Sequence, residues 1–197
     1  MVRLSVQHRF AVNRVRFVNT RARDVRGALI VAKGVSEDRV RRSLFRILRE
    51  NTLCSTATLT TRNRPHINIA YFCYSDELVL YFLSHPDSLH CRNLSTNPYM
   101  AITVFVSSQQ WTRPGRGLQL FGTCREATGL QARKAAELYA KRFPAHAQLR
   151  ACLKPTDTAS EYRFYRFVAK SVKILDEGEL GDEVFVCASV KRAARSH

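Results

Sequence analysis

The sequence predicts a mainly β domain: an antiparallel meander that closes on itself as a β-barrel and is flanked by helices. Six segments between residues 53 and 175 show the two-residue period or the short apolar runs typical of strands. Short polar connections join the first of these segments, as expected for antiparallel neighbours. Helical segments interrupt the strands without alternating regularly with them, which argues against a doubly wound parallel sheet.

The first predicted element is a helix that starts after Ser36. Ser36 is placed to cap it, and Glu37 and Asp38 then lie at the positive end of the helix dipole. Its predicted buried stripe consists of Val40, Leu44, Ile47 and Leu48. The arginines between these positions are typical of a solvated helix face.

The remaining elements follow from changes of period along the chain. The six predicted strands are Leu53–Thr61, Ile67–Ser75, Leu78–Ser84, Ala101–Ser107, Gly117–Glu126 and Tyr162–Leu175. Asp87–Leu94 is expected to supply one or two helical turns. Gly129–Phe143 is expected to form a longer helix that Pro144 ends.

Charge is distributed unevenly along the 197 residues, whose formal net charge is +16. Residues 1–34 carry eight Lys or Arg against one Asp, and residues 191–197 add three more cations. We therefore expect a basic extension over residues 1–34 outside the core, one domain over residues 35–190 and a basic tail over residues 191–197. The extension also has the composition of a transit peptide or of a nucleic-acid-binding arm.

Several classes of protein are not indicated. The longest apolar run, Met100–Val106, is too short to cross a bilayer. The six cysteines are scattered and follow no secretory signal, which favours buried, reduced thiols and a cytoplasmic location. His85, His90 and Cys91 lack the second ligand pair of a zinc site, so no metal is expected.

A series of short motifs carries a family resemblance. In order, they are Cys54–Leu59, Arg64–Asn68, Leu80–Ser84, Ser88–Leu94, Asn97-Pro98 and Gly117–Gly122. This order resembles the flavin-binding split-barrel family related to pyridoxamine 5'-phosphate oxidase. The pattern is most similar to an uncharacterised branch of the family, in which the chain continues into a helix ending Arg142-Phe143-Pro144.

The resemblance implies a six-stranded antiparallel split barrel that acts as a homodimer, with FMN in two clefts at the subunit interface. It places Asn68, Ile69 and Ala70 beside the flavin ring and Gln119 opposite them on a neighbouring strand. It places three further residues at the phosphate: Ser84, Ser88 and His90.

The sequence departs from the family pattern at the phosphate. Leu89 and His90 stand where the family commonly has Arg-Lys, which weakens the expected clamp, although Arg92 is close enough in sequence to serve the same anion. Trp111 follows a predicted strand and is assigned either to stacking on the ring or to anchoring its loop.

The expected function is an FMN-dependent oxidoreductase that exchanges hydride or electrons between a reduced nicotinamide, or a similar donor, and an unknown small molecule. The Arg-containing carboxyl-terminal signature of true pyridoxamine phosphate oxidases is not recognisable in Phe164–Val190, so oxidation of vitamin B6 is not expected. No catalytic residue is assigned, and His66 and His90 are the candidate proton donors. The alternatives are a deazaflavin- or haem-binding protein and a nucleic-acid-binding module built on residues 1–34.

Overall fold

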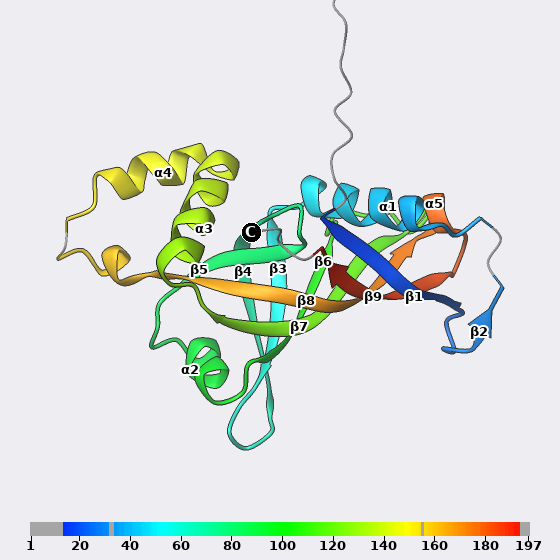
Figure 1. The fold of residues 1–197 in the computed structure, drawn as a ribbon, viewed down its shortest axis with the longest axis horizontal. Helices are drawn as coiled ribbons and strands as arrows, with labels where there is room; N and C mark the ends of the chain where they lie inside the picture. The colour runs from blue at the N-terminus through cyan, green and yellow to red at the C-terminus, as the bar shows by residue number, and fades with distance from the viewer. Residues whose placement is uncertain (1–13, 32–33, 155, 194–197) are drawn as a thin grey trace, which may run out of the picture.

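The computed structural model describes residues 14–31, 34–154 and 156–193. Across these ranges nine strands form one sheet, with five α-helices and one 3-10 helix around it (Figure 1). The strands are β1 (Val15–Arg23), β2 (Leu29–Ile30), β3 (Leu53–Leu59), β4 (Pro65–Tyr74), β5 (Val79–Ser84), β6 (Tyr99–Phe105), β7 (Arg116–Glu126), β8 (Arg163–Asp176) and β9 (Phe185–Arg192). The helices are α1 (Glu37–Glu50), α2 (Leu89–Thr96), α3 (Gly129–Arg142), α4 (Pro144–Ala151), η1 (Thr158–Glu161) and α5 (Glu177–Leu180).

Six of the strands close into an antiparallel barrel. The sheet order is β2-β1-β9-β8-β5-β4-β3-β6-β7, and β7 also pairs with β8. That last pairing joins β8, β5, β4, β3, β6 and β7 into a ring. The mainly β class and the six-stranded barrel are therefore confirmed, and the six strands match the six predicted from the sequence to within a few residues at each end.

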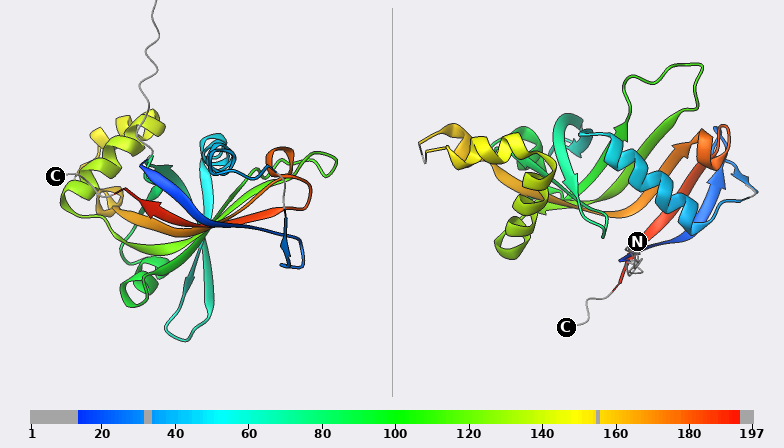
Figure 2. Two further views of the ribbon diagram at one scale, coloured as in Figure 1. Left: turned by 45° about the vertical axis from the view of Figure 1, so that its right-hand side comes forward. Right: turned by 90° about the horizontal axis from the view of Figure 1, so that it is seen from above.

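Strand β8 is long enough to belong to the barrel and to an extension of the sheet. Its first half pairs with β5, and its second half pairs with β9 along the same edge. Strand β1 then pairs with β9, so β9, β1 and β2 continue the sheet away from α3 and α4 (Figures 1 and 2).

The boundary expected at residue 34 is corrected by strand β1. Val15 and Phe17 are buried in the main core, while the arginines between and after them face outward. Basic residues in alternate positions made this strand look like an extension outside the core. Lys191 and Arg192 likewise end strand β9 and are not part of a free tail. The parts of the two expected basic segments that fall in residues 1–13 and 194–197 lie outside the described residues.

Helix α1 covers one side of the barrel and is attached to it through a buried carboxylate. The Ser36 hydroxyl accepts a hydrogen bond from the Arg39 amide, which confirms the predicted cap. Asp176 at the end of β8 is fully buried, where it accepts a hydrogen bond from the Ser43 hydroxyl at 2.6 Å and pairs with Arg46 at 2.5 Å. The predicted apolar stripe of α1 packs into the same core.

Helix α3 covers a second, smaller core on the outside of β5. Ala135 and Tyr139 pack there against Cys73, Val79 and Tyr81. Pro144 ends α3, as predicted, and is also the first residue of α4, which the sequence analysis did not predict. Over the described residues, no helix has both the length and the apolar character needed to cross a membrane.

Candidate functional site

The barrel is split between β4 and β5. These strands pair only from Phe72 to Tyr74 of β4, whereas the first half of β4 pairs with β3 and the end of β5 pairs with β8. The gap opens a cleft of about 630 Å³, which is within the usual range for small-molecule sites. Along this gap β4 has no β5 partner, so its backbone groups on that side are accessible to a ligand.

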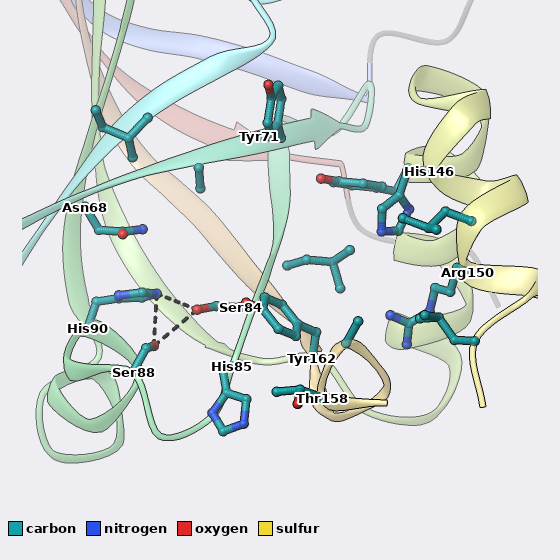
Figure 3. Close-up of a pocket in the computed structure, with 17 residues that line it drawn as sticks. Asn68, Tyr71, Ser84, His85, Ser88, His90, His146, Arg150, Thr158 and Tyr162 are labelled. Atoms are coloured by element: carbon teal, nitrogen blue, oxygen red, sulfur yellow. Dashed lines mark hydrogen bonds between the residues drawn. The ribbon is translucent and has the colours of Figure 1, made fainter. Parts of the chain in front are cut away.

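The walls of the cleft come from six parts of the chain (Figure 3). One wall is β4, and the end of β5 and the start of α2 form a second. The third, across the opening, is formed by α3, α4 and the segment around η1. The lining residues are Asn68, Ile69, Ala70, Tyr71, Leu83, Ser84, His85, Ser88, His90, Tyr139, His146, Leu149, Arg150, Leu153, Thr158, Ala159 and Tyr162.

Two hydroxyls and an imidazole form a triangle at the start of α2 (Figure 3). His90 Nε2 lies 2.6 Å from Ser84 Oγ and 3.2 Å from Ser88 Oγ, and the two hydroxyl oxygens are 3.1 Å apart. Ser88 is the N-cap residue of α2, yet its side chain caps no backbone amide. The first backbone amides of α2 therefore have no side-chain acceptor. Free amides at a helix start commonly bind anions.

His90 is held in its neutral form. Burial lowers the pKa of His90, and the nearby His66 lowers it further. The two rings are nearly parallel, with centroids 6.2 Å apart. The triangle therefore offers an anion hydrogen bonds and a helix N-terminus but no fixed positive charge.

The opposite wall supplies the cation. Arg150 of α4 points into the cleft, and His146 lies one turn before it (Figure 3). Burial lowers the pKa of His146, and the charge of Arg150 lowers it further. At the rim, His85 Nε2 lies 2.7 Å from Glu161 Oε2 and contacts the Tyr162 ring edge-on, which links the end of β5 to the segment before β8.

Six residues assigned from the sequence line this cleft: Asn68, Ile69, Ala70, Ser84, Ser88 and His90. The other four do not. Leu89 is 42% exposed, and Arg92 donates to the Asp87 carbonyl at 2.6 Å. Trp111 is fully exposed on the β6–β7 loop.

Gln119 lies on β7, in a separate shallow hollow on the outer face of the barrel. Ile67, Thr103 and Phe121 line the same hollow. A broader apolar surface surrounds it, for Ile67, Ile69 and Tyr71 on β4 are 69%, 66% and 56% exposed. Isolated domains rarely expose so many large apolar side chains along one strand.

The sequence analysis missed His146, Arg150 and Tyr162. They come from α4 and the segment after it, and α4 has no buried residue among those described. Its sequence therefore lacks the apolar period that reveals a helix. The available signal was Pro144, because proline is favoured at the first position of a helix as well as after one.

The described cysteines do not offer a nucleophile in the cleft. None lines it, and burial raises the pKa of Cys54 and of Cys73 to about 12, so both thiols are protonated at neutral pH. In the same described ranges, no three His, Cys, Asp or Glu side chains are grouped so that they could hold a metal ion.

Comparison with known proteins identifies a family. A family model described as "Pyridoxamine 5'-phosphate oxidase" matches residues 41–184, which include the whole barrel and α1 from its second turn. A search of curated proteins found no match.

Solved structures share the fold at low sequence identity. A haem-binding protein from Mycobacterium smegmatis has a TM-score of 0.59 and 16% identity, with 83% of this chain and 60% of that chain covered. Protein Atu2129 from Agrobacterium tumefaciens, of unknown function, has a TM-score of 0.58 and 22% identity, with 77% and 63% covered. The haem storage protein HutZ from Vibrio cholerae has a TM-score of 0.53 and 16% identity, with 65% and 88% covered.

Proposed function

Because the chain belongs to the pyridoxamine 5'-phosphate oxidase family, we propose that it is an FMN-dependent oxidoreductase that holds the flavin in the cleft between β4 and β5. The observation that carries this proposal is the uncapped start of α2, beside the Ser84–Ser88–His90 triangle, at one end of a cleft of ligand size. The substrate is a small molecule other than pyridoxamine phosphate, and a reduced nicotinamide is the proposed donor.

The lining residues fit the parts of FMN. Its phosphate suits the amides of α2 and the hydroxyls of Ser84 and Ser88, with Arg150 available from the opposite wall. The polar edge of its ring suits the exposed backbone edge and amide side chain of Asn68. The apolar body of the ring suits Ile69 and Leu83.

A bound flavin would supply the transfer of hydride, so the chain's task is to bind and orient. Asn68 and the β4 backbone would fix the position of the ring. Tyr71 and Tyr139, from opposite walls, would limit the access of water. His90 is engaged with both serines and is therefore proposed as a phosphate ligand instead of a proton donor at the ring.

The outer face of the barrel is proposed to pair with a second copy of the chain. Its exposed Ile67, Ile69 and Tyr71 adjoin the cleft, since Ile69 and Tyr71 also line it. Covering this face would shield the cleft from water and bring the partner's barrel next to the ligand. It would also bury Gln119, which the cleft of a single chain does not include.

The test is the visible spectrum of the protein after incubation with FMN and removal of the free cofactor. We expect the absorption bands of oxidised flavin to remain with the protein and to bleach on addition of a reduced nicotinamide under anaerobic conditions. A protein that retains no FMN contradicts the proposed site. A protein that retains FMN but resists reduction by a nicotinamide contradicts only the proposed donor.

Haem binding is the second candidate, because the cleft contains His85, His90 and His146 and neutral imidazole is a common axial ligand of haem iron. Two of the structural relatives are named for haem binding or storage. Parallel titrations with haem, FMN and a deazaflavin decide between the candidates. Tighter binding of haem, with loss of its Soret shift in His146→Ala, supports the second candidate and contradicts the first.

A further inference from the structure

A second cleft lies near the N-terminal end of α3. It has a volume of about 390 Å³ and shares no lining residue with the cleft between β4 and β5. Its walls come from α3, the start of β5, β8 and the end of β9. The residues that line it are Glu77, Tyr81, Leu130, Gln131, Lys134, Arg166, Arg192 and Ala193.

Positive charge exceeds negative charge in this second cleft. Lys134, Arg166 and Arg192 face one carboxylate, Glu77. That carboxylate is already engaged, with Lys134 Nζ at 3.4 Å and a guanidinium nitrogen of Arg14 at 4.0 Å. The charge of Glu77 also acts on Arg192, whose pKa it raises, but one carboxylate does not balance three cations, so a net positive charge remains.

The cations are held close together by the fold. Arg192 donates to the carbonyl oxygens of Glu77 at 2.9 Å, Leu78 at 3.0 Å and Ala169 at 2.8 Å, so neutral groups fix its guanidinium in place. Burial lowers the pKa of Arg192, and the charge of Arg166 lowers it further. An anion bound between the two arginines would relieve this repulsion.

The start of α3 adds to the positive potential. Leu130 and Gln131, in its first turn, line the cleft. The N-cap residue Thr128 makes no side-chain cap, and the first turn contains no acidic residue. The Gln131 amide donates to the Thr128 carbonyl oxygen at 3.0 Å, which leaves the amides of Gly129 and Leu130 to favour an anion, beside three cationic side chains.

We propose that this second cleft binds a small molecule that carries a phosphate group. The arginines, Lys134 and the α3 amides would hold the phosphate, because guanidinium groups and helix N-termini both match its geometry. Leu130, which is 80% exposed, would contact the organic part. The proposal does not depend on a flavin in the other cleft.

The test is a calorimetric titration with phenyl phosphate, with inorganic phosphate as a second probe. The pocket variant combines Lys134→Gln and Arg166→Gln. Its charge-matched control combines Arg133→Gln and Lys141→Gln, two exposed positions on the same helix that line neither cleft. We expect at least a tenfold loss of affinity for phenyl phosphate in the pocket variant and less than a twofold change in the control.

Two further variants separate this site from the proposed FMN site and from effects on folding. A chain with Ser88→Ala and His90→Gln should retain this binding, which separates it from the phosphate site proposed for FMN. Arg166→Lys should fold and retain more affinity than the pocket variant but less than the wild type, because it keeps the charge and loses the paired guanidinium donors. Equal losses in the pocket and control variants, loss confined to the Ser88/His90 variant, or much tighter binding of a single-stranded oligonucleotide than of phenyl phosphate would overturn the proposal.

Discussion

Three neutral side chains form the proposed phosphate site at the start of α2, and Leu89-His90 stand there where the family commonly has Arg-Lys. Ser84, Ser88 and His90 satisfy one another, and the pKa of His90 is lowered by burial. A phosphate dianion would favour the protonated imidazole, since an adjacent negative charge stabilises the charged form. On this account His90 is neutral in the free protein and gains a proton when the anion binds.

The affinity for FMN is therefore predicted to depend on pH. As the pH falls from 8 to 6.5, binding should tighten by up to about tenfold per unit, because the complex takes up a proton that the free protein does not hold. His90→Gln should flatten this dependence. His85→Gln, which alters the rim, should keep it. A slope that survives in His90→Gln would show that another group takes up the proton.

The lowered pKa of His90 also makes the free energy of unfolding depend on pH. Because the pKa of His90 is lower in the folded chain than in the unfolded chain, the unfolded chain binds more protons once the pH falls below about 6.5. The contribution of His90 to the free energy of unfolding is thus complete above that pH and decreases below it. An anion in the cleft opposes this decrease.

Among the secondary-structure elements, β7 and β8 approach each other closely at one point, and the closure of the barrel depends on this contact. Their register shifts between Phe121 and Gly122, opposite the segment from Ala169 to Ser171. A Cβ atom on Gly122 would lie 2.1 Å from the carbonyl oxygen of Val168, which is part of the rigid backbone. Only glycine allows the two strands to meet at this point.

Gly122→Ala is therefore predicted to destabilise the protein by about 1 to 3 kcal/mol, measured by urea denaturation, because the strands must move apart to accept the methyl group. Gly117→Ala is the matched control on the same strand. A Cβ atom there meets Phe105 at 3.9 Å, an ordinary contact, so the free energy of unfolding should change by less than about 0.5 kcal/mol. Equal effects of the two substitutions would contradict this explanation of the closure.

The elements that could be predicted from the sequence are those with a clear period or a short run of apolar residues. The stripe of α1 and most barrel strands were predicted because each has a buried side and an exposed side, whereas β5, which is covered on both sides, was predicted from its short apolar run. Strand β1 was missed because the register shift between Val18 and Arg21 interrupts its alternation, and α4 was missed because its side chains stay partly exposed. The same reasons account for the site: strand residues such as Asn68 were found, and Arg150 on α4 was not.

Arg92 and Trp111 illustrate a different limit. Arg92 was assigned because it is near the cleft residues in the sequence, and Trp111 was assigned because it follows a barrel strand. Arg92 instead closes its own turn through the Asp87 carbonyl, and Trp111 is fully exposed and does not line the cleft of its own chain. Nearness along the chain does not fix the direction of a side chain at a helix start or in a loop.

For the whole molecule, the exposed apolar face is the feature that a single chain leaves unexplained. On one face of the barrel, Ile67, Tyr99, Phe105 and Phe121 are each more than 40% exposed; they lie on β4, β6 and β7, and β3 runs between β4 and β6. A homodimer through this face would remove that area from water and close the mouth of the cleft.

Ile67→Asp is predicted to convert the dimer to a monomer and to weaken FMN binding at the same time, because an unpaired carboxylate would be buried at the interface. Light scattering and a flavin titration measure the two effects. Val25→Asp, at a similarly exposed position near β2, should change neither. A wild-type chain that is monomeric at all concentrations, yet binds FMN tightly, would contradict the proposed homodimer.

The most direct measurement compares the dissociation constants of FMN and riboflavin, which differ only in the phosphate. We expect the wild-type protein to bind FMN at least 100-fold more tightly. A chain with Ser84→Ala, Ser88→Ala and His90→Gln should lose most of this preference and keep only the part that the α2 amides and Arg150 supply. If the wild-type protein does not distinguish FMN from riboflavin, or if the triple variant distinguishes them as strongly as the wild type, the start of α2 is not the phosphate site.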